Sequence, residues 1–398
     1  MHIAYFTETY PPELNGVALT VHRTVQFLRD QGNEVDLIRP RQPGEAEVDE
    51  PGELRTAGLP IPMYPDLRFG LARVSTLRKR LQAFKPRLVH IATQGPLGWA
   101  GARAARSLGI PVTTDFRTNF HQYGRYYGLG FLAPATRAYL RGFHNAAQAT
   151  FVPTRELQAS LASFGFENLH VVGRGVDTSR FDPALRDAAL RAEWGVAEPG
   201  DVGAAEVATV AQPVVLYVGR LAAEKNVPLL FRAIDAARAT HAGLKVVVVG
   251  DGPLRAELQV KHPDAVFLGA LRGEALARCF ASADLFAFPS MSETFGNVVV
   301  EALASGLVVV AFATAAAGEL ISDGVSGLVV KPDDDDAFVA ATSVAIDNFY
   351  LPERTSQVAS MRDAARAVAL ATGWDAILRR FEEHLQRVAD AGSPRPHR

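Results

Sequence analysis

The feature that most constrains this fold is a repeated alternation of short apolar runs with amphipathic helical stretches. This alternation is typical of βαβ units and parallel sheets. It occurs in two series, separated by a break near residues 173–212 where the pattern dissolves. The predicted strands are residues 2–7, 35–38, 88–92, 112–115, 149–152 and 170–172 in the first series, and residues 214–218, 245–249, 265–268, 285–288, 308–311 and 327–330 in the second.

The length of the chain agrees with two domains. At 398 residues it is too long for one ordinary core, and domains of roughly 150 to 200 residues are expected. The predicted fold class is therefore α/β, with two Rossmann-like, doubly wound domains facing each other across a cleft. In such sheets ligands bind beyond the carboxyl ends of the strands.

The charge and composition of the chain limit the kinds of binding partner that we expect for it. The formal net charge of −2 provides no global basic field, so nucleic acid is not an expected partner. Residues 73–87 do predict a basic amphipathic helix, with Arg73, Arg78, Lys79, Arg80, Lys85 and Arg87 around apolar side chains. Two readings stay open for it: peripheral contact with an anionic membrane surface, or a solvated helix face, which we favour.

The cellular location of the protein is predicted from the features that its sequence lacks. The only cysteine, Cys279, cannot form an intramolecular disulfide and is predicted to lie in the core. The first residues read as a strand and not as a signal peptide, and no run approaches the roughly 18 apolar residues of a membrane span. We therefore expect a cytoplasmic protein, either free or peripheral on the inner face of the cytoplasmic membrane.

Several enzyme classes lack their motifs here. A dinucleotide loop needs three spaced glycines after a strand, but residues 8–17 contain only Gly16. In Gly250-Asp251-Gly252-Pro253 the third glycine position is occupied by Arg255. Walker, His-Glu-x-x-His and Cys-x-x-Cys motifs are missing as well. Nicotinamide, nucleotide-hydrolase and common zinc chemistry are thus not expected.

Residues 290–306 form the most informative segment. A strand runs into a turn, and a helix is predicted to start near residues 295–297, so the amides of residues 294–298 are unpaired donors suited to a pyrophosphate. Glu293 stands where a carboxylate can accept hydrogen bonds from sugar hydroxyls, and Glu301, about one turn into the helix, can hold ribose hydroxyls. The alternative places Glu293 in a capping arrangement and Glu301 on the surface.

These residues carry a family resemblance. Glu293 and Glu301, with seven residues between them, resemble the E-x7-E motif of retaining GT-B glycosyltransferases, in particular glycosyltransferase family 4. Residues 219–226 resemble that family's G-R-L-x-x-E-K-N stretch. Arg220 and Lys225 leave a strand end and can converge on a diphosphate. The alternative for both is an ion pair with Glu224 or Glu257.

The resemblance covers nearly the whole chain. Residues 249–253 resemble the family's G-D-G-P turn, residues 11–17 its loop facing the donor phosphates, and residues 173–177 its hinge. It implies an N-terminal acceptor domain, residues 1–173 plus a helix crossing back in residues 374–398, and a C-terminal donor domain, residues 174–373. The implied donor-binding residues are Asn15, Gly16, Gly219, Thr294, Phe295, Gly296, Asn297 and Glu301.

The implied reaction moves a hexose, mannose or glucose, from a GDP- or UDP-linked donor to a lipid, glycolipid or glycan acceptor with retention. Arg220, Lys225 and Glu293 are the implied catalytic residues. No cofactor and no metal are expected, because the two cations and the helix amides replace a metal ion. The spacing resembles bacterial GDP-mannose-dependent α-mannosyltransferases and diacylglycerol glycosyltransferases. A GT-B sugar-nucleotide epimerase and a non-catalytic nucleotide-binding subunit remain as alternatives.

The acceptor side departs from the family pattern. Residues 113–128 resemble its Y-H-T-D-F-P-x-Y region, but Arg117 aligns with the histidine that contacts the donor sugar. His121 lies four residues later, so the sequence leaves open which of the two takes that role. The acidic run at residues 333–336 is predicted to be a solvated first turn of a helix and not a metal site.

Overall fold

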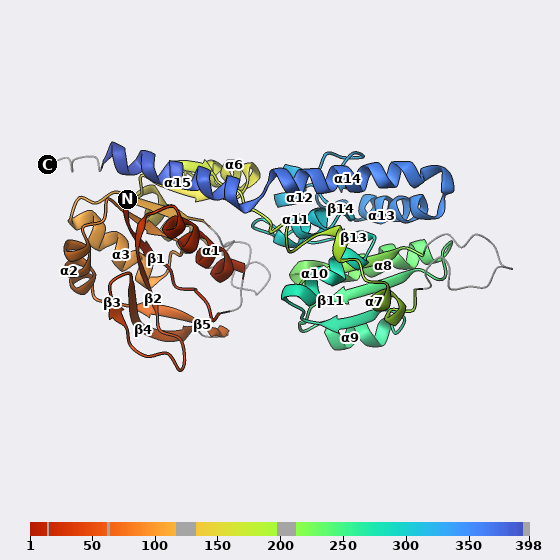
Figure 1. The fold of residues 1–398 in the computed structure, drawn as a ribbon, viewed down its shortest axis with the longest axis horizontal. Coiled ribbons are helices and arrows are strands. Elements are labelled where there is room, and N and C mark those ends of the chain that lie inside the picture. The colour runs from red at the N-terminus through yellow and green to blue at the C-terminus, as the bar shows by residue number, and fades with distance from the viewer. Residues whose placement is uncertain (14–15, 62–63, 117–132, 197–211, 393–398) are drawn as a thin grey trace. The chain divides into compact units, whose positions relative to one another are not determined.

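The computed structural model describes residues 1–13, 16–61, 64–116, 133–196 and 212–392. The chain divides into two compact units (Figure 1). Unit 1 comprises Met1–Gly173 and Asp375–Arg398, and unit 2 comprises Arg174–Trp374. Each unit is built around its own sheet.

The sheet of unit 1 has the strand order β3-β4-β2-β1-β6-β7-β8-β9, with β5 paired to β4. All pairings are parallel except those of β4 with β3 and with β5. The strands are β1 (His2–Phe6), β2 (Glu34–Pro40), β3 (Asp49–Glu50), β4 (Glu53–Ile61), β5 (Tyr64–Leu71), β6 (Leu88–Ile91), β7 (Val112–Asp115), β8 (Ala149–Val152) and β9 (Leu169–Val171).

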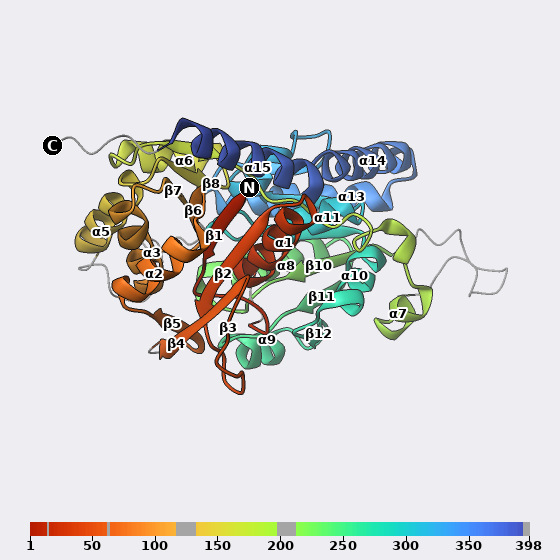
Figure 2. The same ribbon diagram turned by 60° about the vertical axis from the view of Figure 1, so that its left-hand side comes forward.

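Helices cover both faces of this sheet (Figure 2). They are α1 (Gly16–Asp30), α2 (Val74–Phe84), α3 (Pro96–Ser107), α5 (Ala133–Asn145), α6 (Arg155–Ser163) and α15 (Trp374–Ala391). Successive residues of β1 point to opposite faces. Phe6 packs with the side chains of α2 and α3, whereas Tyr5 packs with those of α1 and α15. The first strand therefore joins both cores of the unit.

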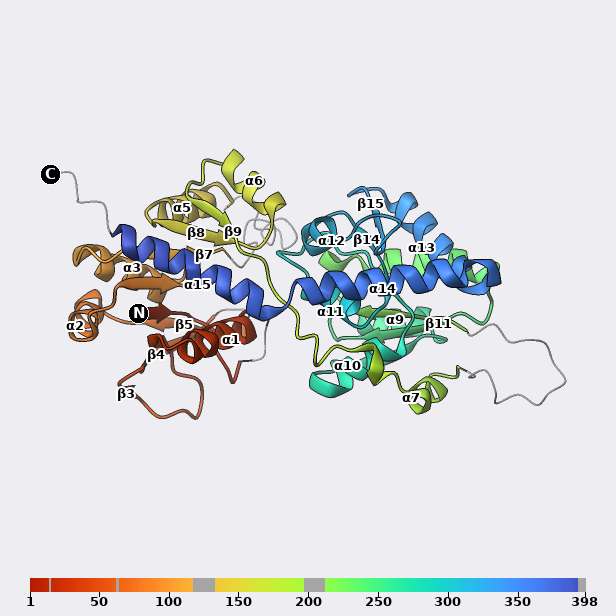
Figure 3. The same ribbon diagram turned by 45° about the horizontal axis from the view of Figure 1, so that its top comes forward.

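The last helix, α15, belongs to unit 1 from Asp375 onward (Figure 3). Its residue Phe381 packs edge-on against Phe151 of β8, with ring centroids 5.1 Å apart. Asn33 also donates a hydrogen bond of 2.7 Å to Glu382. The chain thus returns to its first domain at its end, as the family resemblance implied.

The sheet of unit 2 is entirely parallel and has the order β12-β11-β10-β13-β14-β15. Numbered within the unit, this is the 3-2-1-4-5-6 order of dinucleotide-binding folds, in which the order reverses between the first and fourth strands. Here the reversal lies between β10 and β13. The strands are β10 (Val214–Val218), β11 (Lys245–Val249), β12 (Val266–Gly269), β13 (Leu285–Phe288), β14 (Val308–Phe312) and β15 (Leu328–Val330).

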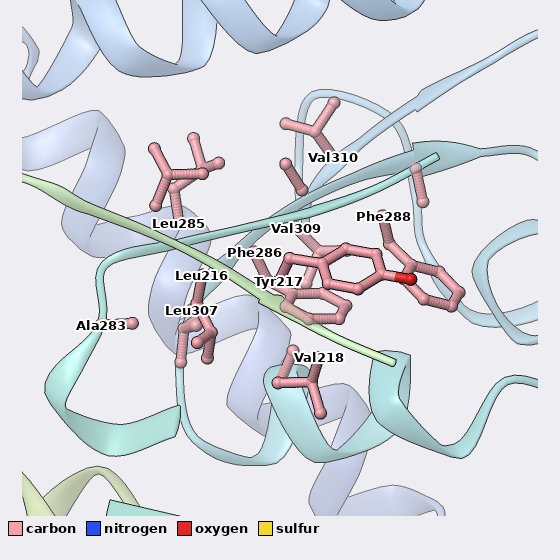
Figure 4. Close-up of a cluster of buried hydrophobic side chains, with 14 of the residues drawn as sticks. Leu216, Tyr217, Val218, Ala283, Leu285, Phe286, Phe288, Leu307, Val309 and Val310 are labelled. Carbon is pink, nitrogen blue, oxygen red and sulfur yellow. The ribbon is translucent and has the colours of Figure 1, made fainter. Parts of the chain in front are cut away.

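The central strands of unit 2 are continuous apolar runs because helices cover both faces. Figure 4 shows this core, with Leu216, Phe286 and Val309 contributed by neighbouring strands. The covering helices are α7 (Ala188–Glu193), α8 (Val227–Arg238), α9 (Arg255–Lys261), α10 (Gly273–Ser282), α11 (Asn297–Ala304), α12 (Ala315–Leu320), α13 (Asp335–Tyr350) and α14 (Thr355–Ala371).

The predicted strands are confirmed within one or two residues, but the sequence prediction missed β3, β4 and β5. These strands form an antiparallel extension of the sheet in unit 1. Prolines and glycines inside β4 and β5 interrupt the alternation of apolar and polar residues that identifies a strand. The short helix α7, in the predicted break at residues 173–212, was also missed.

The predicted basic helix is α2, but its basic residues do not form one free face. Arg80 donates 2.8 Å and 2.9 Å hydrogen bonds to the buried carboxylate of Asp36. Arg87, beyond the helix, pairs with Asp390 of α15 at 2.6 Å. Part of the predicted positive surface therefore holds unit 1 together.

A buried carboxylate ties the start of unit 2 to its sheet. Asp284, directly before β13, accepts 2.9 Å hydrogen bonds from Arg186, from the buried Arg191 of α7 and from the Val214 amide. Arg191 also donates to the Ser282 carbonyl at 2.7 Å. One acidic side chain thus fixes the segment that follows the boundary between the units.

The turn after β11 packs directly on the turn after β10. The amide of Gly219 donates to the Val249 carbonyl at 3.0 Å, and that of Leu221 donates to the Asp251 carbonyl at 2.9 Å. Gly250 has φ +144°, and a Cβ placed on it would lie 1.9 Å from the Gly219 carbonyl oxygen. Only glycine therefore allows these two turns to meet.

Replacing Gly250 with alanine is expected to destabilise unit 2 by about 1–3 kcal/mol, because the backbone must leave a strained conformation or separate the turns. Denaturant unfolding followed by circular dichroism measures the change. The matched control is Gly373→Ala, since a Cβ there meets only the Leu370 carbonyl, at 3.7 Å. Equal stability of the two variants would contradict the packing argument.

Candidate active site

The site in unit 2 lies at the strand reversal. The loop after β10 carries Gly219, Arg220 and Lys225, and the loop after β13 carries Glu293 and leads into α11. Because β10 and β13 are parallel neighbours, both loops leave the same edge of the sheet. The fold thus brings together the two segments that carry the sequence motifs.

The two loops are joined by side-chain contacts. Lys225 Nζ donates to Glu293 Oε1, and Ser290 Oγ donates to the same oxygen at 2.9 Å. The Lys225 and Glu293 side chains are only 15% and 18% exposed. Ser292 Oγ donates to the Glu224 carbonyl at 2.8 Å. The cation and the carboxylate predicted to act on the same ligand are therefore direct neighbours.

Arg220 is more exposed. Its Nη1 lies 3.5 Å from Oε1 of the buried Glu224, and 45% of its side chain is accessible. This is one of the two ion pairs considered as an alternative for Arg220. The other acid, Glu257, pairs instead with Lys261 at 2.7 Å. A guanidinium has five N–H donors, and the half-exposed position of Arg220 makes its side chain accessible to a ligand.

A buried tyrosine of β10 fixes the backbone at Arg220. Tyr217 Oη donates to the Arg220 carbonyl at 3.1 Å, and the Tyr217 ring lies beside Phe288 in the core (Figure 4). Burial raises the pKa of Tyr217, so the hydroxyl remains a donor. Tyr217 was not among the predicted site residues, because an aromatic residue in a buried strand is usually interpreted as part of the hydrophobic core.

The N-terminus of α11 points its first amides into this region. Gly296 precedes the helix with φ +86°, a left-handed conformation that turns the chain into the helix. Phe295 is buried, and its carbonyl accepts from the Ala316 amide at 2.7 Å. The first N–H groups of a helix lack intrahelical acceptors and carry partial positive charge. Among the described residues, the buried Oδ1 of Asn297 also has no hydrogen-bond partner.

Glu301 lies on α11, one turn into the helix. Burial raises the pKa of its carboxyl to about 7, and Arg180 opposes that shift. The side chain is still partly exposed. A carboxyl of this kind changes charge near neutral pH, which distinguishes it from an ordinary surface glutamate.

The corresponding edge of unit 1 lies between β1 and β6, where its strand order reverses. Gly16 is the exposed first residue of α1, whereas the predicted residues Asn15, Arg117 and His121 lie outside the described residues. The Glu8 carboxylate accepts a 2.7 Å hydrogen bond from the Leu97 amide at the start of α3, and burial raises its pKa to about 7.

Sequence reasoning missed Glu8. The available signal was an acidic residue directly after the first strand, at the sheet edge where ligands bind. The backbone amide of Glu8 also donates a hydrogen bond to Thr93 Oγ1 at 2.7 Å. Glu8 therefore fixes the loop between β6 and α3 from both its backbone and its side chain.

The acidic run at residues 333–336 has structural partners. Asp334 caps α13 by accepting from the Ala337 amide at 3.0 Å, and Asp336 pairs with Arg232 at 2.8 Å. Within the described ranges, no group of three or more histidine, cysteine, aspartate or glutamate side chains is arranged to hold a metal ion.

None of the described helices is long and apolar enough to cross a membrane.

Comparisons with known proteins agree with this architecture. Residues 14–180 match the family profile "Glycosyltransferase Family 4", and residues 212–348 match "Glycosyl transferases group 1". Among solved structures, sucrose-phosphate synthase from Thermosynechococcus elongatus superposes with a TM-score of 0.72 at 19% identity. That superposition covers 98% of this chain and 100% of the other. The fold is thus that of the GT-B glycosyltransferases.

Sequence relatives extend over nearly the full length. A GDP-mannose-dependent alpha-mannosyltransferase of Mycolicibacterium smegmatis is 35% identical across 98% of both chains. An alpha-monoglucosyldiacylglycerol synthase of Streptococcus pneumoniae is 26% identical over 82% of this chain and 74% of its own. These relatives are transferases and not epimerases or binding subunits. The chain belongs to glycosyltransferase family 4 and is a hexosyltransferase that uses a nucleotide-sugar donor.

Proposed function

We propose that this enzyme transfers mannose from GDP-mannose to a lipid or glycan acceptor, with retention of configuration and without a metal ion. The observation that carries the proposal is the Lys225–Glu293 pair beside the N-terminus of α11, at the strand reversal of unit 2. Mannose and GDP are favoured because relatives at 35% and 32% identity over nearly the full length are GDP-mannose-dependent alpha-mannosyltransferases. Glucose from a UDP-linked donor is the second candidate, supported by the glucosyldiacylglycerol synthase relative.

The donor diphosphate is assigned to the amides that open α11, together with Lys225 and Arg220. Helix N-termini bind phosphate through unpaired N–H groups and partial positive charge. The negative charge on the leaving diphosphate grows as the glycosidic bond breaks, so fixed cations at this point lower the barrier. Lys225 is well placed because its loop and that of Glu293 are already held together.

The two glutamates are assigned to hydroxyl groups of the donor. Glu293, held by Lys225 and Ser290, accepts hydrogen bonds from sugar hydroxyls. Glu301, one turn further along α11, accepts from the ribose hydroxyls. A carboxylate can accept several such bonds at once, which fixes the sugar relative to the diphosphate.

Retention is proposed to follow a front-face course. The bond between the anomeric carbon and the diphosphate oxygen breaks, and a bond to the acceptor oxygen forms on the same face of the sugar. The acceptor hydroxyl passes its proton to an oxygen of the leaving diphosphate. The roles left to the protein are positioning of the reactants and charge stabilisation.

Nucleotide binding is expected to be independent of divalent metal. GDP should raise the melting temperature of the protein more than UDP or ADP does, because a ligand that binds only the native state stabilises it. EDTA at about 5 mM should leave the shift caused by GDP unchanged. Thermal-shift measurement of the full chain tests both points. Loss of the GDP shift on adding EDTA, with recovery on adding Mg²⁺, would overturn the metal-free site.

Donor binding is expected to strengthen as pH rises through about 7, because the Glu301 carboxyl ionises there and only the carboxylate accepts two ribose hydrogen bonds. Its ionised fraction rises about tenfold between pH 6 and pH 8. Calorimetric titration with GDP should follow this change in affinity. In Glu301→Gln the remaining pH dependence should come only from the nucleotide phosphate, so equal slopes in both proteins would refute the role of Glu301.

A further inference from the structure

Glu224 is a buried acid within the candidate donor site. It lies in the short 3-10 helix η3 (Ala223–Lys225), directly before Lys225. Its side chain is only 5% exposed, whereas that of Arg220 is 45% exposed. The proposed reaction assigns no step to Glu224. Because burying a charge is costly unless a partner compensates it, the partners of this carboxylate indicate what it does.

The Glu224 carboxylate faces the guanidinium of Arg220. Its Oε1 lies 3.5 Å from Arg220 Nη1, and within the described part of the chain this buried oxygen accepts no hydrogen bond. If the guanidinium moved away, the buried negative charge would lose the cation that compensates it, and such an arrangement is strongly unfavourable. Electrostatic attraction therefore keeps the Arg220 guanidinium beside Glu224.

The main chain of Arg220 is fixed as well. Its carbonyl accepts hydrogen bonds of 3.1 Å from Tyr217 Oη and 3.1 Å from the Ala222 amide. The Tyr217 ring is buried in the core of unit 2 (Figure 4). A Cβ on Gly219 would lie 2.8 Å from Tyr217 Oη, so glycine leaves room for this hydroxyl beneath the loop. Arg220 is thus held at its backbone by Tyr217 and at its side chain by Glu224.

Glu224 also joins the two loops of the site. Its carbonyl accepts a 2.8 Å hydrogen bond from Ser292 Oγ, and Ser292 directly precedes Glu293. The residue after Glu224 is Lys225, which donates to Glu293 Oε1. Glu224 therefore contacts Arg220 through its side chain and the loop of Glu293 through its backbone.

We propose that Glu224 is a positioning residue for the transfer reaction, whose buried carboxylate holds the Arg220 guanidinium in the orientation that stabilises the leaving diphosphate. This inference rests on the proposed role of Arg220 in the donor site. The diphosphate gains negative charge as the glycosidic bond breaks, and a guanidinium that is already oriented needs no reorganisation at that moment. In this role Glu224 acts through Arg220 and does not itself contact the substrate.

The test is a double-mutant cycle with Glu224→Gln and Arg220→Ala in the full chain, measured as nucleotide release from the donor that the wild-type enzyme uses. Glu224→Gln keeps the shape of the side chain and removes its charge, so kcat should fall about tenfold. The KM for the donor should change by less than about threefold, because the charge that Arg220 faces grows only as the bond breaks. In the Arg220→Ala background the same substitution should change kcat by less than about twofold, since its effect passes through Arg220.

Thermal unfolding separates this role from a purely structural one. Glu224→Gln should melt at or above the wild-type temperature, because it removes a buried charge, and the half-exposed Arg220 that loses its partner can be hydrated. The matched control is Glu257→Gln, the same change at an exposed acid of unit 2 that pairs with Lys261 at 2.7 Å. The control should keep kcat within about twofold of the wild-type value.

Two results would overturn the role of Glu224 alone: a wild-type kcat in Glu224→Gln while Arg220→Ala is impaired, or an equal loss from Glu224→Gln in both backgrounds. An unchanged kcat in Arg220→Ala would instead overturn the donor-site role of Arg220, and this inference with it. If Glu224→Gln does not fold, Glu224→Asp replaces it. That variant withdraws the carboxylate by one methylene and should lower kcat only where Arg220 is present.

Discussion

Replacing Lys225 with alanine is expected to lower kcat by at least about 100-fold, because it removes a cation from the point where the leaving diphosphate gains charge. The substitution also leaves the Glu293 carboxylate without its Lys225 partner. Initial rates of GDP release from GDP-mannose, with an acceptor that the wild-type enzyme uses, measure the effect. Lys225→Arg keeps the charge and should retain more activity than the alanine variant.

The matched control for Lys225 is Lys261→Ala. Lys261 is an exposed lysine of the same unit, paired with Glu257 at 2.7 Å. Its replacement should leave kcat within about twofold, because exposed pairs contribute little. Turnover of Lys225→Ala near the wild-type level would remove Lys225 from the donor site, provided that its thermal unfolding matches that of the wild type.

Replacing Asp284 with alanine is expected to destabilise unit 2 by about 3–5 kcal/mol, since it leaves a buried arginine without its carboxylate. Asp284 accepts from Arg191, Arg186 and the Val214 amide, and the Arg191 side chain is 1% exposed. The loss should appear as a lower denaturant midpoint for unit 2. The expected decrease in the free energy of unfolding is larger than that for Gly250→Ala. Asp284→Ala removes the carboxylate that faces a buried charge, whereas Gly250→Ala strains only a turn.

The control for Asp284 is another acid of unit 2 in an ion pair. Asp336 pairs with Arg232 at 2.8 Å, but its side chain is 99% exposed. Asp336→Ala should change the free energy of unfolding by no more than about 1 kcal/mol. A similar small change in Asp284→Ala would show that the buried network does not stabilise the unit.

Much of the fold was predictable because parallel strands buried on both faces leave a strong sequence signal. Residues 214–218, 245–249 and 285–288 were predicted with the bounds that the structure has. The antiparallel strands β4 and β5 gave no such signal, because Pro60 and Gly70 interrupt their pattern. Their positions depend on pairing between residues distant in the sequence, which local periodicity does not contain.

The site was predictable in composition but not in its contacts. Motif spacing placed Lys225 and Glu293 at the edge of one sheet, yet their ion pair depends on how two loops 68 residues apart meet. The buried role of Glu8 likewise depends on the position of α3, because its partner is the Leu97 amide. Sequence reasoning finds residues beside strand ends, whereas hydrogen-bond partners require the packed fold.

The most direct test of the donor site is a crystal structure of the full chain with GDP. We expect the diphosphate to lie on the amides that open α11, with Lys225 and Arg220 contacting its oxygens and Glu301 beside the ribose. A diphosphate bound elsewhere, with Lys225 still on Glu293 and the start of α11 empty, would rule out this donor site.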